Sequence, residues 1–350
     1  MSTVLAFFKK PFIRKYANYF ILALITLVFG ALSLSGSLKM GNQFLLEQIA
    51  IAMLLAVSLG MVVGFLGELS LGHAGFMCVG AFLGGKVSAI LVPALGTNAN
   101  SILVLVISLL VGGLSAAVFG MIIGLPALRL RGDYLAIVTL AFGEIVRNVV
   151  MNLPEQLFGA TLGLETPRFD RKYLFIIALI AVLACLAVTQ NLMRSKHGRA
   201  IISIKDNEIA ARAMGVDITK YKLFVFTISS FFAGVAGVLY SYTQSRLQTP
   251  TFDYNYSIEI LVMVVLGGMG SINGAALAAA LITFINFKLQ TVLTGNLSVL
   301  QNVIYSLILI VIVIYRNAPG LKAFREKYNL AVLLQKLKGK RAETEEKEDA

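Results

Sequence analysis

The sequence predicts an all-α membrane protein, a polytopic bundle of about ten transmembrane helices. Three observations predict this fold class. First, 58% of the 350 residues are hydrophobic and only 14% are charged, against about 25% charged residues in soluble domains. Second, apolar runs of about 20 residues recur, which is the length of helix that crosses a bilayer. Third, basic residues gather in a few segments between these runs. The composition therefore excludes a pair of soluble domains.

The expected spans follow one another with polar connections. They cover approximately residues 16–35, 44–66, 73–92, 102–125, 134–151, 173–192, 223–242, 257–266, 275–292 and 299–315. Gly-containing stretches at residues 60–75 and 267–274 interrupt the pattern, and broken or re-entrant segments there would lower the number of crossings. Small residues four apart, such as Gly80 and Gly84, predict helices that pack closely together.

Bases are concentrated in three segments. Residues 9–15 hold four bases, residues 194–222 hold seven bases against three acids, and residues 316–341 hold eight bases against one acid. Because cytoplasmic loops carry an excess of Lys and Arg, both termini and residues 194–222 are expected in the cytoplasm. This distribution accounts for the net charge of +12 without a nucleic-acid partner. The expected organisation is a cytoplasmic segment 1–15, a transmembrane domain 16–317 and a cytoplasmic basic and acidic tail 318–350.

Residues 194–222 form a polar island between two long apolar runs, and a short helix is expected within it. Asp206 or Asn207 can cap its N-terminus, and Glu208 lies at the positive end of the helix dipole. Arg212 follows Glu208 by four residues, and Gly215 supplies the stop. A helix of about seven residues is too short to be stable alone, so it is expected to dock against a surface.

Several kinds of chemistry are excluded by the residues themselves. Cys78 and Cys185 both fall in apolar runs and are interpreted as packed thiols, and two His and two Cys do not make a convincing zinc site. Ser70 and His73 are three apart, but no third group is visible to orient the histidine, which argues against catalysis. Residues 80–87 resemble a phosphate-binding loop, yet Val87 stands where Ser or Thr must hold magnesium. No ATPase site, metal or cofactor is expected in this chain.

Ionisable residues within the spans are few. Glu144 and Arg147 are three apart on one helix face, and two interpretations stay open: a structural ion pair, or a role along a watery path.

Four stretches carry a resemblance to a known family. They are Gly67–Phe76, Arg129–Leu140, Glu208–Val216 and Val265–Ser271. In this order they resemble the signatures of ABC-importer permeases for branched-chain amino acids, over about residues 45–317. The second and third stretches resemble the M-type permease of the two that such importers pair.

The resemblance implies an ATP-driven importer in the cytoplasmic membrane of a bacterium or archaeon. This chain would pair with a homologous permease to form the path. Two cytoplasmic ATPases would bind ATP and magnesium, and an extracytoplasmic binding protein would deliver leucine, isoleucine or valine. A zwitterionic substrate needs backbone dipoles and polar side chains along its path. The path candidates are Ser70, His73, Thr139, Glu144, Gly267 and Gly268.

The island would then be the coupling helix that docks in a groove of the ATPase. Its expected coupling residues are Lys205, Asp206, Glu208, Ala210, Ala211, Arg212 and Gly215. Ala210-Ala211-x-x-x-Gly215 resembles the core of the importer coupling loop. The usual downstream Ile-x-Leu-Pro is absent, with Val225 at the corresponding spacing and no proline.

Other functions stay open from the residues alone. A related importer would carry urea, amides, sugars or nucleosides. A stand-alone secondary transporter would need well-placed buried acids, which the sequence does not show. An intramembrane enzyme would need a catalytic motif, and none is present.

Overall fold

The computed structural model describes residues 30, 39–96, 101–130, 132–167 and 169–292, together with the helical residues 303–304, 306–307, 310–311 and 314. The chain divides into two compact units, residues 1–287 and residues 288–350. The predicted first span, apart from Gly30, and most of the predicted tenth lie outside the described residues.

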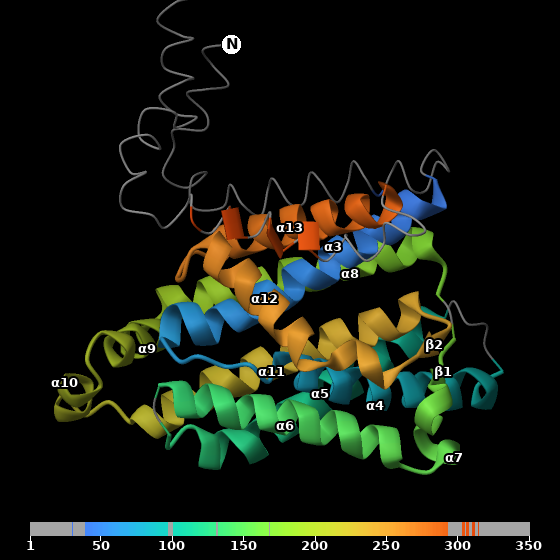
Figure 1. Ribbon diagram of the computed structural model, residues 1–350. Coiled ribbons are helices and arrows are strands. Elements are labelled where there is room, and N and C mark those ends of the chain that lie inside the picture. The colour runs from blue at the N-terminus through green and yellow to red at the C-terminus, as the bar shows by residue number, and fades with distance from the viewer. Residues whose placement is uncertain are drawn as a thin grey trace, which may run out of the picture. The chain divides into compact units, whose positions relative to one another are not determined.

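Long helices make up most of the described chain (Figure 1). They are α3 (Met40–Gly60), continued by the π-helix η1 (Met61–Leu66), α4 (His73–Ala94), α5 (Ile102–Ala127), α6 (Asp133–Asn152), α8 (Arg171–Arg194), α11 (Ile218–Thr243), α12 (Tyr254–Gly267) and α13 (Ile272–Val292). The shorter elements are α7 (Glu155–Phe158), η2 (Ala160–Leu162), β1 (Leu164–Glu165), α9 (Lys196–Asp206), α10 (Glu208–Ala213), β2 (Arg246–Leu247) and η3 (Thr249–Phe252).

Seven helices among the described residues are long and apolar enough to cross a membrane. The prediction of an all-α membrane protein is therefore confirmed, and the predicted and observed helices agree to within a few residues at most ends. The eighth expected span is instead the 14-residue α12. At about 1.5 Å per residue it is roughly 21 Å long, shorter than a bilayer core of about 30 Å.

The core of the first unit forms where α11 packs against α4 and α5. The predicted small-residue packing is observed between α4 and α11, where a Cβ added at Gly80 would lie 2.3 Å from the carbonyl oxygen of Gly234. Nearby, Phe76 stacks against Phe142 and Phe226 at ring-centroid distances of 5.3 and 5.4 Å. Glycines thus allow two helix backbones to touch, and aromatic side chains fill the adjoining space.

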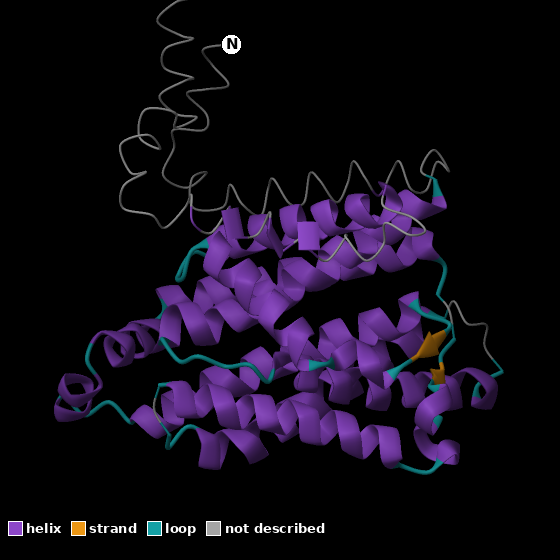
Figure 2. Cartoon of the chain, viewed as in Figure 1, coloured by secondary structure: helices purple, strands orange, loops and turns teal. Residues whose placement is uncertain are grey.

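The two ends of the first unit are built differently. At one end lie α9 and α10 of the island, and at the other lie α7 and the antiparallel β1–β2 pair (Figure 1). Residues 67–72 have no regular secondary structure. In Figure 2 they run from the end of η1 back between the helices towards the start of α4. The Gly-containing stretch at residues 60–75 is thus a broken segment, as the sequence indicated.

Candidate functional site: the polar island and two helix breaks

The island folds into two short helices, α9 and α10, followed by the first turn of α11. Each begins at a polar cap: Ser195, Asn207 and Asp217 accept hydrogen bonds from the backbone N–H groups of Gly198, Ala210 and Lys220. The helix predicted near residue 208 is confirmed, and of the two proposed caps it is Asn207 that accepts the bond. Asn207 is also the only residue between α9 and α10. The 11-residue helix α9 was not predicted.

The end of α10 follows a standard helix-termination pattern. Gly215 has a φ of +82°, and its N–H donates to the Arg212 carbonyl at 3.0 Å while the N–H of Val216 donates to the Ala211 carbonyl at 3.1 Å. These two bonds form the Schellman motif, in which a left-handed residue, usually glycine, ends the helix. The stop predicted at Gly215 is therefore confirmed. The predicted pair between Glu208 and Arg212 also forms, at 3.4 Å.

The α10 helix and its C-cap residue Met214 present apolar side chains to their surroundings. Ile209 is 77% exposed and Met214 is 84% exposed, whereas Ala211 is buried within this chain. Of the other expected coupling residues, Glu208 is half-buried, and the exposed ones are Lys205, Asp206, Ala210, Arg212 and Gly215. Ile209 and Met214 were not among the expected coupling residues, although two large apolar residues in a charged loop indicate an interaction surface.

A buried lysine joins the island to the first helix break. The side chain of Lys222 is 3% exposed, and its Nζ contacts Glu68 Oε1 of the 67–72 segment and, at 3.5 Å, Glu208 Oε2 of α10. The seventh span was expected to begin at Leu223, but α11 begins at Ile218. Lys222 therefore lies one turn inside a helix, where its side chain faces the bundle. The sequence analysis counted it only as one of the bases of the island.

A second lysine of the island reaches η1, the π-helix that precedes this break. Lys205 Nζ donates to the carbonyl oxygen of Gly64 in η1 at 2.7 Å. The other side of Gly64 faces a second break, residues 268–271 between α12 and α13, because a Cβ added at Gly64 would lie 2.6 Å from the backbone nitrogen of Gly270. The island therefore contacts η1 beside the first break, and η1 contacts the second break, although these segments are far apart in sequence.

Two of the expected path residues, Ser70 and Thr139, lie close together at the first break, residues 67–72. The N–H of Leu71 donates to Thr139 Oγ1 on α6 at 3.0 Å. Ser70, the preceding residue, is buried, and its Oγ has no hydrogen-bond partner among the described residues. Ser70 and Thr139 are therefore neighbours in one buried region, and their place along a substrate path stays a prediction.

His73 belongs to the same region but does not pair with Ser70. Ser70 precedes α4, so the helical turn that would bring the two side chains together does not form. Instead, His73 Nε2 lies 2.8 Å from Ser58 Oγ. Ser229 Oγ donates to the Ser58 carbonyl at 2.7 Å, and the N–H of Ala74 donates to Ser257 Oγ at 3.1 Å. Four helices, α3, α4, α11 and α12, therefore meet through polar contacts at the start of α4.

The Glu144 carboxylate contacts a side chain of its own helix and the backbone at the start of another helix. Its Oε2 accepts bonds from Arg147 at 2.7 and 3.0 Å, and its Oε1 accepts the N–H of Tyr254 at 3.1 Å, at the start of α12. Both carboxylate oxygens are thereby engaged, which favours the ion-pair interpretation over a role along the path.

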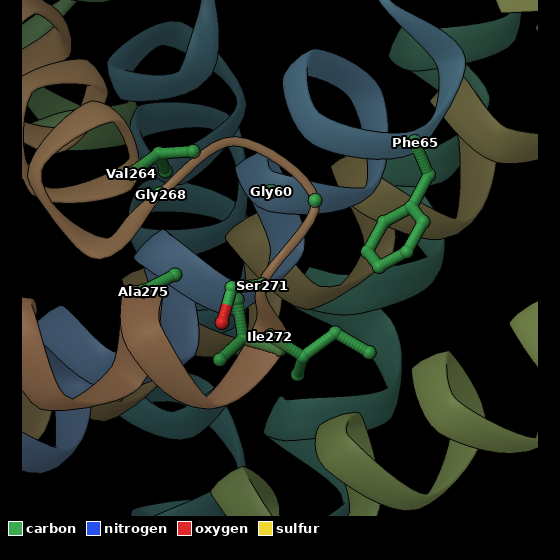
Figure 3. A pocket seen from close by; sticks show the side chains of 9 residues that line it. Gly60, Phe65, Val264, Gly268, Ser271, Ile272 and Ala275 are labelled. Carbon is green, nitrogen blue, oxygen red and sulfur yellow. The ribbon is translucent and has the colours of Figure 1, made fainter. Parts of the chain in front are cut away.

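The second break joins α12 to α13 through residues 268–271 and borders a small pocket (Figure 3). The pocket is lined by Val57, Gly60, Phe65, Val264, Gly268, Gly270, Ser271, Ile272 and Ala275. Its space holds roughly one water molecule. Gly268, with a φ of +97°, ends α12, and Ser271 Oγ accepts the N–H of Gly274 at 3.2 Å to begin α13. This pocket is thus too small for a ligand the size of an amino acid.

One buried acid escaped the sequence analysis. Glu47 lies inside α3 and is fully buried, and neither carboxylate oxygen has a hydrogen-bond partner among the described residues. It falls within the expected span 44–66, where its charge is the signal that was overlooked. The two cysteines are free and buried, as predicted. Within the described part of the chain, no group of His, Cys, Asp or Glu is arranged to hold a metal ion.

Comparisons with known proteins agree with this architecture. A family described as "Branched-chain amino acid transport system / permease component" matches residues 43–314. The chain is 38% identical over 263 residues to the high-affinity branched-chain amino acid transport system permease protein LivM of Salmonella typhimurium, covering 66% of this chain and 60% of that relative. It is 28% identical over 257 residues to a probable branched-chain amino acid transport permease protein LivM of Methanocaldococcus jannaschii, covering 64% and 74%.

A permease named for a different substrate aligns with more of the chain at lower identity. The ribose import permease protein RbsC of Escherichia coli K12 is 25% identical over 337 residues, which is 89% of this chain and 96% of that relative. The matched part of the chain spans only 60% of the length of the Salmonella relative. No solved structure matches. Because the family match extends over most of the chain, this multi-pass membrane protein belongs to the family of branched-chain amino acid transport permease components.

Proposed function

We propose that this chain is the M-type permease subunit of an ATP-driven importer for leucine, isoleucine and valine. The observation that carries the proposal is α10, a six-residue helix with its own cap and stop, exposed at one end of the first unit. A helix this short needs a docking surface. In the proposed complex that surface is a groove of a cytoplasmic ATPase, with Ile209 and Met214 entering it.

The rest of the assembly follows from this role. A homologous permease supplies the other half of the path, two ATPases bind ATP and magnesium, and an extracytoplasmic protein delivers the amino acid. The island and both termini lie in the cytoplasm of a bacterium or archaeon, as the excess of bases indicates. The name of the Salmonella relative supports the branched-chain substrate.

The path of the substrate is proposed to run beside the two breaks. Ser70 and Thr139 offer hydroxyl groups, His73 a ring nitrogen, and Gly267 and Gly268 backbone dipoles, which a zwitterionic amino acid requires in place of water. The pocket at the second break has room for only about one water molecule. The structure is therefore interpreted as a closed state, and the breaks must separate during transport by alternating access.

Reconstitution of the complex in vesicles tests this function. The permease pair, both ATPases and the binding protein should take up labelled leucine only when ATP is present, and this chain alone under a proton or sodium gradient should take up none. Unlabelled isoleucine and valine should compete, and ribose and urea should not. Uptake by the chain alone would support a secondary transporter, and competition by ribose would support the function printed for the ribose import permease.

Variants of α10 test the coupling role. Gly215→Pro cannot adopt the φ of +82°, and Glu208→Arg places a positive charge beside Lys222 and Arg212. Either change should abolish substrate-stimulated ATPase activity while membrane insertion continues. Ile209→Glu and Met214→Glu should weaken binding of the ATPase, whereas Thr219→Glu, an exposed position in the first turn of α11, should not. Unchanged coupling in all four α10 variants would overturn the assignment.

A further inference from the structure

The ion pair between Lys222 and Glu68 joins two segments that have different roles in the proposed function. Glu68 belongs to residues 67–72, which carry Ser70 and contact Thr139 through Leu71. Lys222 belongs to α11 and also reaches Glu208 of α10 at 3.5 Å. The island therefore has a charged contact with the segment that borders the proposed path.

The charges alternate along this contact. Arg212, Glu208, Lys222 and Glu68 follow one another as base, acid, base and acid, each paired with the next. Burial increases from Arg212 to Lys222: the side chain of Arg212 is 67% exposed, that of Glu208 23% and that of Lys222 3%. Glu68, at 12%, lies at the inner end. A charged group moved out of water is held strongly by its partner, because solvent no longer screens the pair.

This ion pair links segments that are far apart along the chain. Glu68 is separated from Lys222 by 154 positions along the chain, and Lys222 is the residue that contacts both the island helix and the break. A cation at this place fixes the distance between α10 and residues 67–72. A buried apolar residue would fill the same space without fixing that distance, because hydrophobic contact has no direction.

From this geometry we infer that Lys222 and Glu68 are positioning residues for transport: their ion pair carries displacement of α10 to the 67–72 segment and so to Ser70. The inference rests on the proposed function, since it needs a partner that moves α10. It concerns the contact between Lys222 and Glu68 within this chain, and not the surface of the partner on which α10 docks. Lys205, which bonds the Gly64 carbonyl, is a parallel contact from the same island.

The test uses the reconstituted importer with three methionine variants. Glu68→Met removes the acid while Lys222 keeps Glu208 as its partner. The double variant Glu68→Met/Lys222→Met removes both charges and leaves no buried ion without a partner, a change that is often tolerated in folding. Lys220→Met removes a lysine two positions away on the same helix, exposed and outside the ion-pair series, and serves as the matched control.

The quantities to compare are ATPase activity with and without the loaded binding protein, uptake per ATP hydrolysed, and recovery of the assembled complex. In Glu68→Met and in the double variant, substrate stimulation and uptake per ATP should fall about tenfold, within the roughly 5–150-fold range of typical coupling between sites. Basal ATPase activity and assembly should persist. Lys220→Met should match the unaltered chain.

Three outcomes would overturn the inference. The first is normal coupling in the double variant, which would show that packing alone suffices. The second is an equal fall of basal and stimulated activity with loss of the ATPases from the complex, which would give the pair a merely structural role. The third is an equal loss in Lys220→Met. If the unaltered complex shows no ATP-dependent uptake, the proposed function itself fails, and this result is separate from the other three.

Discussion

Each end of the first unit holds an ion pair between segments distant in sequence, and the two pairs differ in their exposure to solvent. At the island end, Lys222 and Glu68 are 3% and 12% exposed. At the other end, Arg246 and Glu165 join β2 to β1 at 2.5 Å with exposures of 50% and 74%. Water and salt screen the second pair but not the first. A base and a glutamate therefore form a buried pair at one end and an exposed, screened pair at the other.

The largest effect is expected from breaking the buried pair on one side only. Lys222→Ala leaves the Glu68 carboxylate mostly buried without a cation, which typically costs about 3–5 kcal/mol. Thermal unfolding of the purified chain in detergent measures the loss, with Lys220→Ala as the exposed control. A loss no greater than that of the control would place this pair in the same class as the one at the other end.

A second effect tests whether the island end is tightly packed around the buried pair. A Cβ at Gly64 would lie 2.6 Å from the backbone nitrogen of Gly270, so Gly64→Ala should destabilise by about 1–3 kcal/mol through overpacking. Gly60 lies one turn earlier, and a Cβ added there would meet no atom of a neighbouring element within 4 Å among the described residues. Gly60→Ala should stabilise by about 0.5–1 kcal/mol. Equal melting temperatures for the two variants would contradict the close contact of the breaks.

A third effect concerns the buried polar contacts deeper in the bundle. Ser58→Ala removes the Oγ that lies 2.8 Å from His73 Nε2 and leaves a buried ring nitrogen with one partner fewer. The expected cost is about 1–3 kcal/mol. Ser230→Ala is the control, because the buried Ser230 Oγ donates to a carbonyl four residues earlier in the same helix. Similar unfolding temperatures for both variants would show that the His73 contact contributes little.

The smallest effect is expected at the exposed pair. Arg246→Gln should change the free energy of unfolding by about 0–1 kcal/mol, and raising the salt concentration should remove even this difference. The same detergent melt in low and high salt measures it. A cost comparable with that of Lys222→Ala would erase the contrast between the two ends.

Much of the fold was predictable from the sequence. Apolar runs of span length located the membrane-crossing helices among the described residues, because period and composition are local properties. Asn207, Glu208, Arg212 and Gly215 also predicted α10, since caps and stops act within one helical turn. The tail and the predicted first span lie outside the described residues, and their structure stays a prediction.

The contacts between distant segments were not predictable in this way. Nothing near Lys222 in the sequence indicates that its partner is Glu68, and Ser58 gives no local sign of its contact with His73. Such contacts depend on how helices pack, and a single chain carries no local signal for this. The start of α11 at Ile218 was missed because charged residues in its first turn resemble the preceding loop. The helix brings Lys222 inward all the same.

Asn207 has a mechanical consequence for the island. It ends α9 and caps α10 at once, so the two helices meet at an elbow with no intervening loop to stretch or fold. A linker of several residues would absorb a small push as slack. In the proposed function, a one-residue elbow pinned by a hydrogen bond from Ala210 would pass on a push to α10 as a tilt of α9, the helix that holds Lys205.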